Sequence, residues 1–322
     1  MTKPPPAAAP QSRAEEVRAL VRRDEPIVMG GLHDGVSARL AERAGFPLTF
    51  MGGYAVAASL LGEPDIGLLT QVEMADAARR LCRLVSMPVL VDADTGYGGI
   101  PNAVRTAELY AQAGAAGIFL EDQVWPKRCG HMVGKAVVDR ADWLAKLRAV
   151  VDLRPSTDLF VVARTDARAP LGLEEAIRRG RAALDVGVDA VFVEAPQSVA
   201  ELHAIAIGIP GPKVANMVEW GKTPLLGPTE LHQRGFDLIV FPVAAILAQA
   251  RAVGEVYATL LRRGNTSGIL KQLYPFEKFN ELLGLDAHRR REKDSLAAAK
   301  AARPPLRSVP KPKKRTSSRP RR

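Results

Sequence analysis

The chain has 322 residues, 47% of them hydrophobic, so it is long enough to bury a full core, and barrels of roughly 250 residues often fold as one domain. Its two cysteines, Cys82 and Cys129, give no disulfide framework, and no run of about 18 apolar residues exists, so we expect a cytoplasmic protein without a membrane partner. The net charge of +10 comes almost entirely from residues 303–322, which carry nine Lys and Arg side chains and no acid.

Both ends of the chain are predicted to lie outside the folded domain, which would span residues 13–290. Residues 1–12 lack an apolar signal core and are interpreted as a disordered leader. Residues 291–322 form a basic tail rich in Pro and Ser that cannot bury enough apolar surface to fold. Such a tail can bind nucleic acid weakly, but a solvated tail without a specific partner is the favoured interpretation.

Between these ends, short apolar runs alternate with helical patterns, two of which begin with a capping box, at Thr70 and at Ser198. The predicted strands cover residues 26–30, 47–51, 88–92, 117–120, 159–163, 190–193, 213–216 and 238–241. The predicted helices cover residues 34–44, 70–85, 101–113, 140–152, 173–186, a segment from 198, one near 229, and 243–263. Eight strand–helix units predict a (β/α)8 TIM barrel, of class α/β. An open doubly wound sheet is the alternative, weakened by the lack of a G-x-G-x-x-G motif.

Catalytic groups of a barrel lie at the C-terminal ends of its strands. The residues in those positions are Gly52, Gly53, Tyr54, Asp92, Asp94, Glu121, Asp122, Arg164, Asp166, Glu194 and Asn216. So many carboxylates without a His pair favour a hard cation, Mg²⁺ or Mn²⁺, over zinc. A cation among acids, with an arginine nearby, suits an anionic substrate rich in oxygen.

The loop after residue 120 carries Lys127, Arg128, Cys129, Gly130 and His131. A thiol beside two cations, and beside a histidine that can be protonated, is predicted to have a lowered pKa because positive charge favours the thiolate. A buried structural cysteine is the alternative, but the polar neighbourhood argues against it.

Four motifs together resemble the isocitrate lyase/phosphoenolpyruvate mutase superfamily, and the resemblance extends from about Pro26 to Gly284. The motifs are residues 91–98, 121–123, 127–131 and 163–166. Lys-Arg-Cys-Gly-His is typical of the lyase branch, where the cysteine lies on a mobile gating loop. Residues 125–126 and 217–224 look closest to the 2-alkylmalate and dimethylmalate lyases, the group of the petal death protein.

The resemblance implies roles for individual residues. Asp92 would bind Mg²⁺, while Asp65, Asp94 and Glu121 would hold its water ligands. The catalytic residues would be Cys129 as general acid, Arg164 as the group that binds the 2-oxoacid unit, and Lys127 and His131 beside them. The substrate would be bound by Gly52, Gly53, Tyr54, Gly130, Arg164, Glu194 and Asn216.

Two positions depart from the family pattern. Gly52 stands where the family commonly has a serine, so one hydroxyl donor is missing. Leu247 stands where methylisocitrate lyases carry an arginine, and an apolar side chain cannot pair with a third carboxylate. The second departure argues against methylisocitrate and for a malate-type di-acid.

The resemblance implies a Mg²⁺-dependent carbon–carbon lyase acting on a 2-hydroxy di-acid of the 2-alkylmalate, dimethylmalate or methylisocitrate type. Loss of the hydroxyl proton would break the neighbouring bond, and Cys129 would protonate the resulting enolate. The sequence does not identify the group that takes the first proton, and it shows no base–orienter pair that would make Cys129 a nucleophile. The alternatives are an oxaloacetate hydrolase, a carboxyphosphonoenolpyruvate phosphonomutase, and a protein that binds nucleic acid through its tail.

The apolar segment 269–283 follows the last helix that a barrel needs. We expect it to bury against another subunit. The resemblance implies that a C-terminal helix is swapped between subunits and that two such dimers form a homotetramer.

Overall fold

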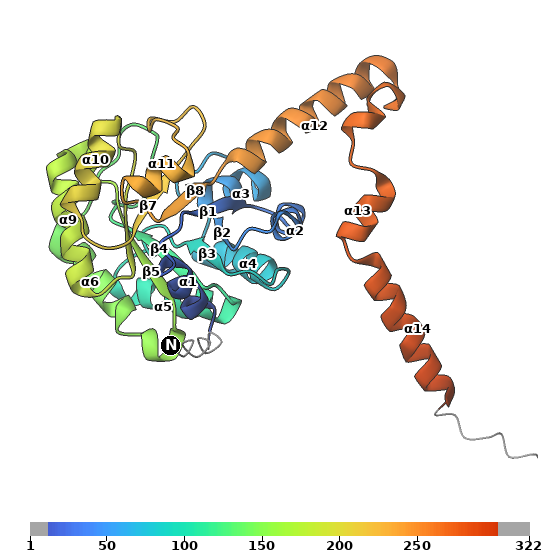
Figure 1. The fold of residues 1–322 in the computed structure, drawn as a ribbon, viewed down its shortest axis with the longest axis horizontal. Coiled ribbons are helices and arrows are strands. Elements are labelled where there is room, and N and C mark those ends of the chain that lie inside the picture. Colours follow the sequence, from blue (N-terminus) through green and yellow to red (C-terminus); the bar gives the residue numbers. More distant parts are fainter. Residues whose placement is uncertain (1–11, 302–322) are drawn as a thin grey trace, which may run out of the picture. The chain divides into compact units, whose positions relative to one another are not determined.

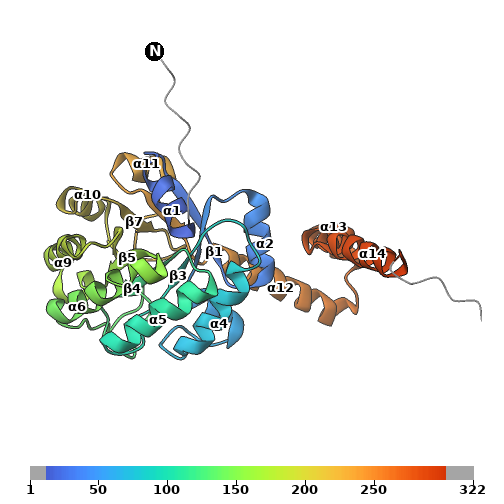
Figure 2. The ribbon, with the colours of Figure 1, turned by 90° about the horizontal axis from the view of Figure 1, so that it is seen from below.

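Eight parallel strands close into a barrel in the order in which they occur in the chain, and helices surround it (Figures 1 and 2). The structure, a computed structural model, describes residues 12–301. The barrel closes where β1 pairs with β8, with Gly30 opposite Phe241. The predicted (β/α)8 fold is therefore confirmed. The strands are β1 (Ile27–Leu32), β2 (Leu48–Met51), β3 (Val89–Asp92), β4 (Gly117–Glu121), β5 (Phe160–Thr165), β6 (Ala190–Val193), β7 (Lys213–Asn216) and β8 (Leu238–Phe241).

A helix follows each strand, as the alternating pattern predicts. These helices are α2 (Gly35–Ala44), α4 (Gln71–Cys82), α5 (Ile100–Ala113), α6 (Arg140–Val151), α9 (Leu173–Val186), α10 (Val199–Gly208), α11 (Pro228–Gln233) and α12 (Ala244–Arg263). Four further helices were not predicted: α1 (Arg13–Val21), α3 (Gly53–Leu60), α7 (Arg154–Thr157) and α8 (Arg168–Leu171). The start of α1 did carry a signal, because Ser12 accepts a hydrogen bond from the Glu15 N–H. No such signal precedes α3, whose first turn has no side-chain cap.

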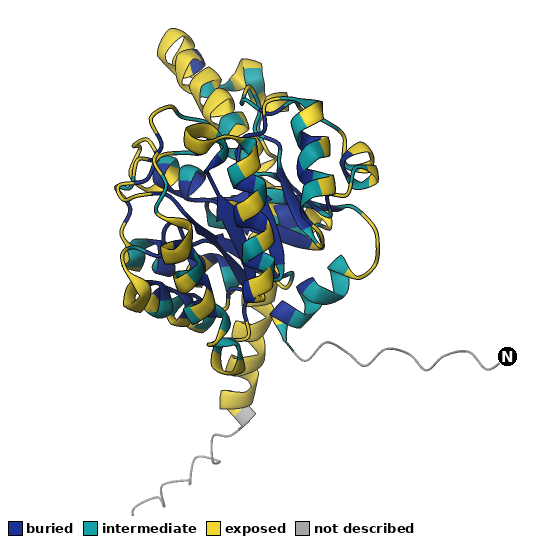
Figure 3. Cartoon of the chain, turned by 90° about the vertical axis from the view of Figure 1, so that its left-hand side faces the viewer, coloured by how far each residue is buried: buried dark blue, intermediate teal, exposed yellow. Residues whose placement is uncertain are grey.

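Helix α1 closes the N-terminal end of the barrel. Its Ala14 and Val17 belong to the same buried cluster as the inward-facing strand residues. Arg18 ties it there through an ion pair of 2.9 Å to Asp189, just before β6. A second cluster fills the space between the strands and the outer helices, whose outer faces are exposed (Figure 3). With the interior filled and one end covered, the C-terminal end of the strands is the place for a site.

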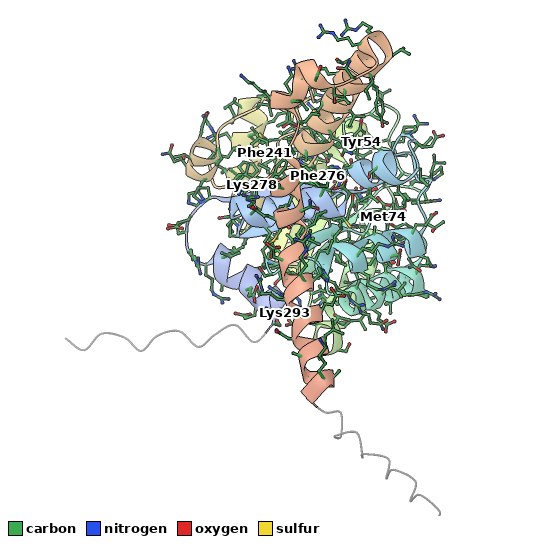
Figure 4. All side chains as sticks on the ribbon, turned by 90° about the vertical axis from the view of Figure 1, so that its right-hand side faces the viewer. Tyr54, Met74, Phe241, Phe276, Lys278 and Lys293 are labelled. Atoms are coloured by element: carbon green, nitrogen blue, oxygen red, sulfur yellow. The ribbon has the colours of Figure 1, made fainter. Side chains whose placement is uncertain are left out.

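The chain divides after Ile269 into two compact units, earlier than the predicted domain boundary at residue 290. The second unit contains α13 (Phe276–Leu282) and α14 (Leu285–Ala301). Phe276 of α13 is 80% exposed (Figure 4). The prediction of a disordered tail from residue 291 is wrong as far as Ala301, because α14 continues through a segment rich in helix-forming Ala, Leu, Lys and Glu. The rest of the predicted leader and tail, residues 1–11 and 302–322, lies outside the described residues.

Helix swapping and tetramer formation stay predictions. Across residues 12–301, we find no helix with both the length and the apolar character needed to cross a bilayer.

Candidate active site

A cavity of about 300 Å³ lies at the C-terminal end of the barrel strands. Strand ends line it together with two loops, residues 129–132 and 218–221. Three of the predicted site residues, Asp94, Glu121 and Lys127, lie behind the lining, each paired with a residue that faces the cavity. The other predicted site residues all line the cavity: Gly52, Gly53, Tyr54, Asp65, Asp92, Cys129, Gly130, His131, Arg164, Glu194 and Asn216.

Asp65, Asp92 and Asp94 form a compact group with one lysine. Asp92 accepts hydrogen bonds from the backbone N–H groups of Gly53 (3.2 Å) and Asp94 (3.0 Å). The Lys127 ammonium lies 2.5 Å from Asp65 and 2.7 Å from Asp94. Burial raises the pKa of Asp92, and the charge of Asp94 raises it further. Burial alone would lower the pKa of Lys127, but the surrounding carboxylates hold it well above its usual value.

This group of acids fits a magnesium ion. The carboxylate oxygen Oε1 of Glu121 is buried and has no hydrogen-bond donor, and burial raises the pKa of this acid well above its usual range. Across residues 12–301, no three His, Cys, Asp or Glu side chains lie close enough together to bind one ion directly. Mg²⁺ needs only one or two direct carboxylates and keeps several waters, whereas zinc needs three or four protein ligands. Asp92 would be the direct ligand, with Asp65, Asp94 and Glu121 holding waters.

Arg164, at the end of β5, is held by three carboxylates. Its guanidinium lies 3.0 Å from Asp166, 3.2 Å from Glu121 and 3.3 Å from Glu194. It also stacks 5.5 Å above the ring centre of Phe192. Burial would lower the pKa of Arg164, but these acids raise it well above its usual value, so the group is a fixed cation. A fixed cation at the cavity wall can bind a substrate carboxylate or stabilise an oxyanion.

The predicted low pKa of the Cys129 thiol is wrong. Burial raises this pKa to about 11, and the carboxylates of Glu194 and Asp65 contribute to that rise. The loop also fixes the residue through its backbone, since the Cys129 N–H donates to the Asp65 carbonyl at 3.1 Å. The thiol is therefore protonated at neutral pH, which suits a proton donor better than a nucleophile.

The two cations next to Cys129 in sequence do not act on its thiol. Lys127 turns toward Asp65 and Asp94, and the Arg128 guanidinium donates to the Val133 carbonyl at 3.1 Å. Although these residues adjoin Cys129 in sequence, the loop geometry directs their charges away from its thiol.

His131 links two loops. The Lys222 N–H donates to its Nδ1 at 2.9 Å. Its Nε2 faces Glu194 at 3.3 Å. The two ring nitrogens thus face groups other than the Cys129 thiol, which argues against an activated nucleophile. Burial would raise the pKa of Glu194, but Arg164 and His131 hold it at about 2. Asn216, on β7, donates to the same carboxylate at 3.3 Å.

Two glycines permit close contacts in the site. A Cβ at Gly130 would lie 2.3 Å from a side-chain carbon of Glu194, so the cysteine loop is pressed onto that acid. A Cβ at Gly52 would lie 2.9 Å from the ring of Phe50, so this aromatic side chain occupies the space next to the missing serine. Tyr54 lines the cavity from the first turn of α3.

A buried network behind the cavity was not assigned from the sequence. Asp122 accepts from the Thr165 hydroxyl (2.6 Å), the Asp166 N–H (2.8 Å) and Arg179 (3.0 Å). Lys135 donates to Asp166 at 2.8 Å. The position of Asp122 and Asp166 just after strands was a usable signal. Nothing in the sequence marked Lys135, because its side chain reaches its partners only through the fold of the loop.

Comparisons with known proteins agree with this site. Residues 17–261 match the family model described as phosphoenolpyruvate phosphomutase. The 2,3-dimethylmalate lyase of Eubacterium barkeri is 41% identical over 85% of this chain and 94% of its own. The petal death protein of Dianthus caryophyllus is 44% identical over 87% of this chain and 88% of its own.

A solved structure has a similar fold. Oxaloacetate acetylhydrolase, in complex with the inhibitor 3,3-difluorooxalacetate, superposes with a TM-score of 0.84 and 36% identity, covering 89% of this chain and 98% of that one. The likeness extends over the whole barrel and includes enzymes named for lyase and hydrolase activities. This chain is therefore an enzyme of the phosphoenolpyruvate mutase/isocitrate lyase superfamily.

Proposed function

We propose that this protein is a Mg²⁺-dependent carbon–carbon lyase that cleaves a malate-type 2-hydroxy di-acid into a 2-oxoacid and a carboxylic acid. The observation that carries the proposal is the protonated Cys129 thiol, which lines the same cavity as Arg164 and Asp92. A proton donor, a fixed cation and a metal-binding acid are the groups that such a cleavage needs. The named activity of the dimethylmalate lyase relative supports the same reaction.

Different residues act on the two halves of the substrate. Mg²⁺, when bound at Asp92, supplies the Lewis acidity that lowers the pKa of a substrate hydroxyl. Arg164 orients the carboxylate beside that hydroxyl and offsets the charge that develops as the bond breaks. Cys129 donates its proton to the enolate carbon of the leaving half. The loop pressed onto Glu194 excludes water, which would otherwise protonate the enolate in place of Cys129.

The cavity wall favours an alkyl-substituted substrate. Phe50, Val240, Val243 and Leu247 line one part of it with apolar side chains. Methyl groups gain from burial there, whereas an extra carboxylate would be buried without a partner. We therefore propose a 2-alkylmalate or dimethylmalate as the substrate.

The test is release of a 2-oxoacid from a panel of malates with and without Mg²⁺. We expect turnover of alkylmalates that EDTA abolishes. Leu247→Arg should shift the preference toward substrates with a third carboxylate, and Leu247→Met is the matched control. Turnover that is indifferent to EDTA, or an Arg variant with unchanged preference, would contradict the proposal.

Oxaloacetate hydrolysis is a second candidate because of the likeness to oxaloacetate acetylhydrolase. The same panel separates the two activities. Formation of oxalate and acetate from oxaloacetate, without cleavage of any malate, would identify the hydrolase.

A further inference from the structure

Lys135 holds the cysteine loop from a buried position. Its ammonium donates to the Gly130 carbonyl at 2.5 Å and to the Asp166 carboxylate at 2.8 Å. The Lys135 side chain is 1% exposed, and that of Asp166 is fully buried. Gly130 directly follows Cys129, so this one ammonium joins the backbone of the proton-donor loop to the end of β5.

Asp166 is shared between Lys135 and Arg164. Its Oδ1 accepts from Lys135 at 2.8 Å and from the Nη2 of Arg164 at 3.3 Å, while its Oδ2 accepts from the Nε of Arg164 at 3.0 Å. Two cations thus compete for one carboxylate oxygen. A substrate carboxylate that accepts hydrogen bonds from Arg164 weakens the pairing of Arg164 with Asp166. Asp166 then binds Lys135 more strongly.

If the loop opens, the Gly130 carbonyl moves away and the buried ammonium loses one of its two acceptors. A buried charge with an incomplete set of partners is strongly disfavoured. The closed loop is therefore the arrangement that satisfies Lys135. Lys222 also contacts this loop, but from a half-buried position: its backbone N–H donates to His131 at 2.9 Å and its ammonium to the Met132 carbonyl at 3.4 Å.

We propose that Lys135 is a positioning residue that keeps the Cys129 loop closed and couples its closure to substrate binding at Arg164. The proposal rests on the proposed function, since it assumes that an anionic substrate binds Arg164. Substrate at Arg164 releases Asp166 to Lys135, Lys135 holds Gly130, and the loop places Cys129. By linkage, a closed loop also strengthens the binding of the anion.

The test measures how fast N-ethylmaleimide modifies Cys129, followed by mass spectrometry of the intact protein and its peptides. In Lys135→Met we expect modification roughly 10- to 100-fold faster than in wild type, the factor expected for losing a hydrogen bond to a charged group. The kcat should fall by a similar factor. Saturating oxalate with Mg²⁺ should slow modification in wild type and have little effect in the variant. Lys135→Arg, which keeps the charge and donors, should behave like wild type.

The controls separate positioning from general loss of structure. Lys213→Met removes another buried lysine that donates to backbone carbonyls, those of Ile209 and Gly211 at the start of β7. It should leave the modification rate of Cys129 unchanged. Cys82 reports on global unfolding in every sample, and its rate should stay constant. Lys135→Gln gives the same readout if Lys135→Met does not fold.

The proposal is overturned if N-ethylmaleimide modifies Cys129 in Lys135→Met at a rate within twofold of wild type, or if Lys213→Met shows an equal increase. It is also overturned if oxalate protects Cys129 equally in wild type and Lys135→Met, or protects it in neither. Because modification is measured without turnover, the result stands whether or not the lyase activity is found.

Discussion

Replacing Cys129 by serine is the sharpest test of its role as the proton donor. Serine keeps the size and a hydroxyl in place of the thiol, so the loop and the cavity should be preserved. The change removes the acidity of the group and little else. The KM should therefore change little, and the loss should appear in kcat.

The size of the loss follows from the two acidities. The pKa of the Cys129 thiol is raised to about 11, chiefly by burial, whereas a serine hydroxyl is a far weaker acid, comparable to water. If about half of this difference is expressed in the rate, as in Brønsted behaviour, kcat falls by roughly 10²–10³. That lies within the range of roughly 10²–10⁴ usual for losing an acid–base group.

The pH dependence gives the sign of the effect. A proton donor works in its protonated form, so the wild-type kcat should stay level through neutral pH and fall as the pH approaches about 11. A nucleophile works as the thiolate, and kcat would then rise over the same range. Steady-state kinetics of 2-oxoacid release at several pH values distinguish the two, as long as the fold persists by circular dichroism.

The matched control is Cys82→Ser. Cys82 ends α4, and burial raises the pKa of its thiol to about 12. It does not line the cavity, so its variant should turn over like wild type. A Cys129→Ser enzyme with wild-type kcat would refute the lyase mechanism even though the fold is right.

Four further outcomes are expected. Asp92→Ala should abolish Mg²⁺-dependent turnover with the fold intact by circular dichroism; wild-type activity in EDTA would contradict the metal site. The variant Asp122→Asn tests the raised pKa of Asp122, which burial and the charge of Asp166 bring to about 6. Because this value exceeds the ordinary 3.8, ionisable Asp122 stabilises the fold fully below about pH 4 and loses that contribution as the pH rises through 6. Urea unfolding should thus show a larger wild-type advantage over the variant at pH 4 than at pH 8, and an equal advantage would refute the raised pKa. Deleting residues 303–322 should leave kcat and KM unchanged in the same assay, and a tenfold fall in kcat/KM, about 1.4 kcal/mol, would show a role for the tail. Light scattering at micromolar concentration should show a tetramer, and a monomer would rule out the proposed assembly.

The sequence by itself determined the barrel and the location of its site. Apolar runs with the length of strands, alternating with capped helices, favour a closed parallel barrel over an open sheet, and that arrangement brings the strand ends together. Asp92, Glu121, Arg164, Glu194 and Asn216 could therefore be placed in one site before their contacts were known. The sequence did not predict α3, because the first turn of this helix has no side-chain cap that would mark its start.

Only the tertiary structure decided how the site residues are charged and held. The Cys129 thiol has neighbouring cations in the sequence, yet burial and two carboxylates from distant elements raise its pKa. His131 is held in place because the backbone N–H of Lys222 donates to its Nδ1. Lys135 reaches Asp166 across a loop that no periodicity describes. Proton affinity depends on the desolvation and on the charges within a few ångströms, and these are set by the packing of segments far apart in the chain.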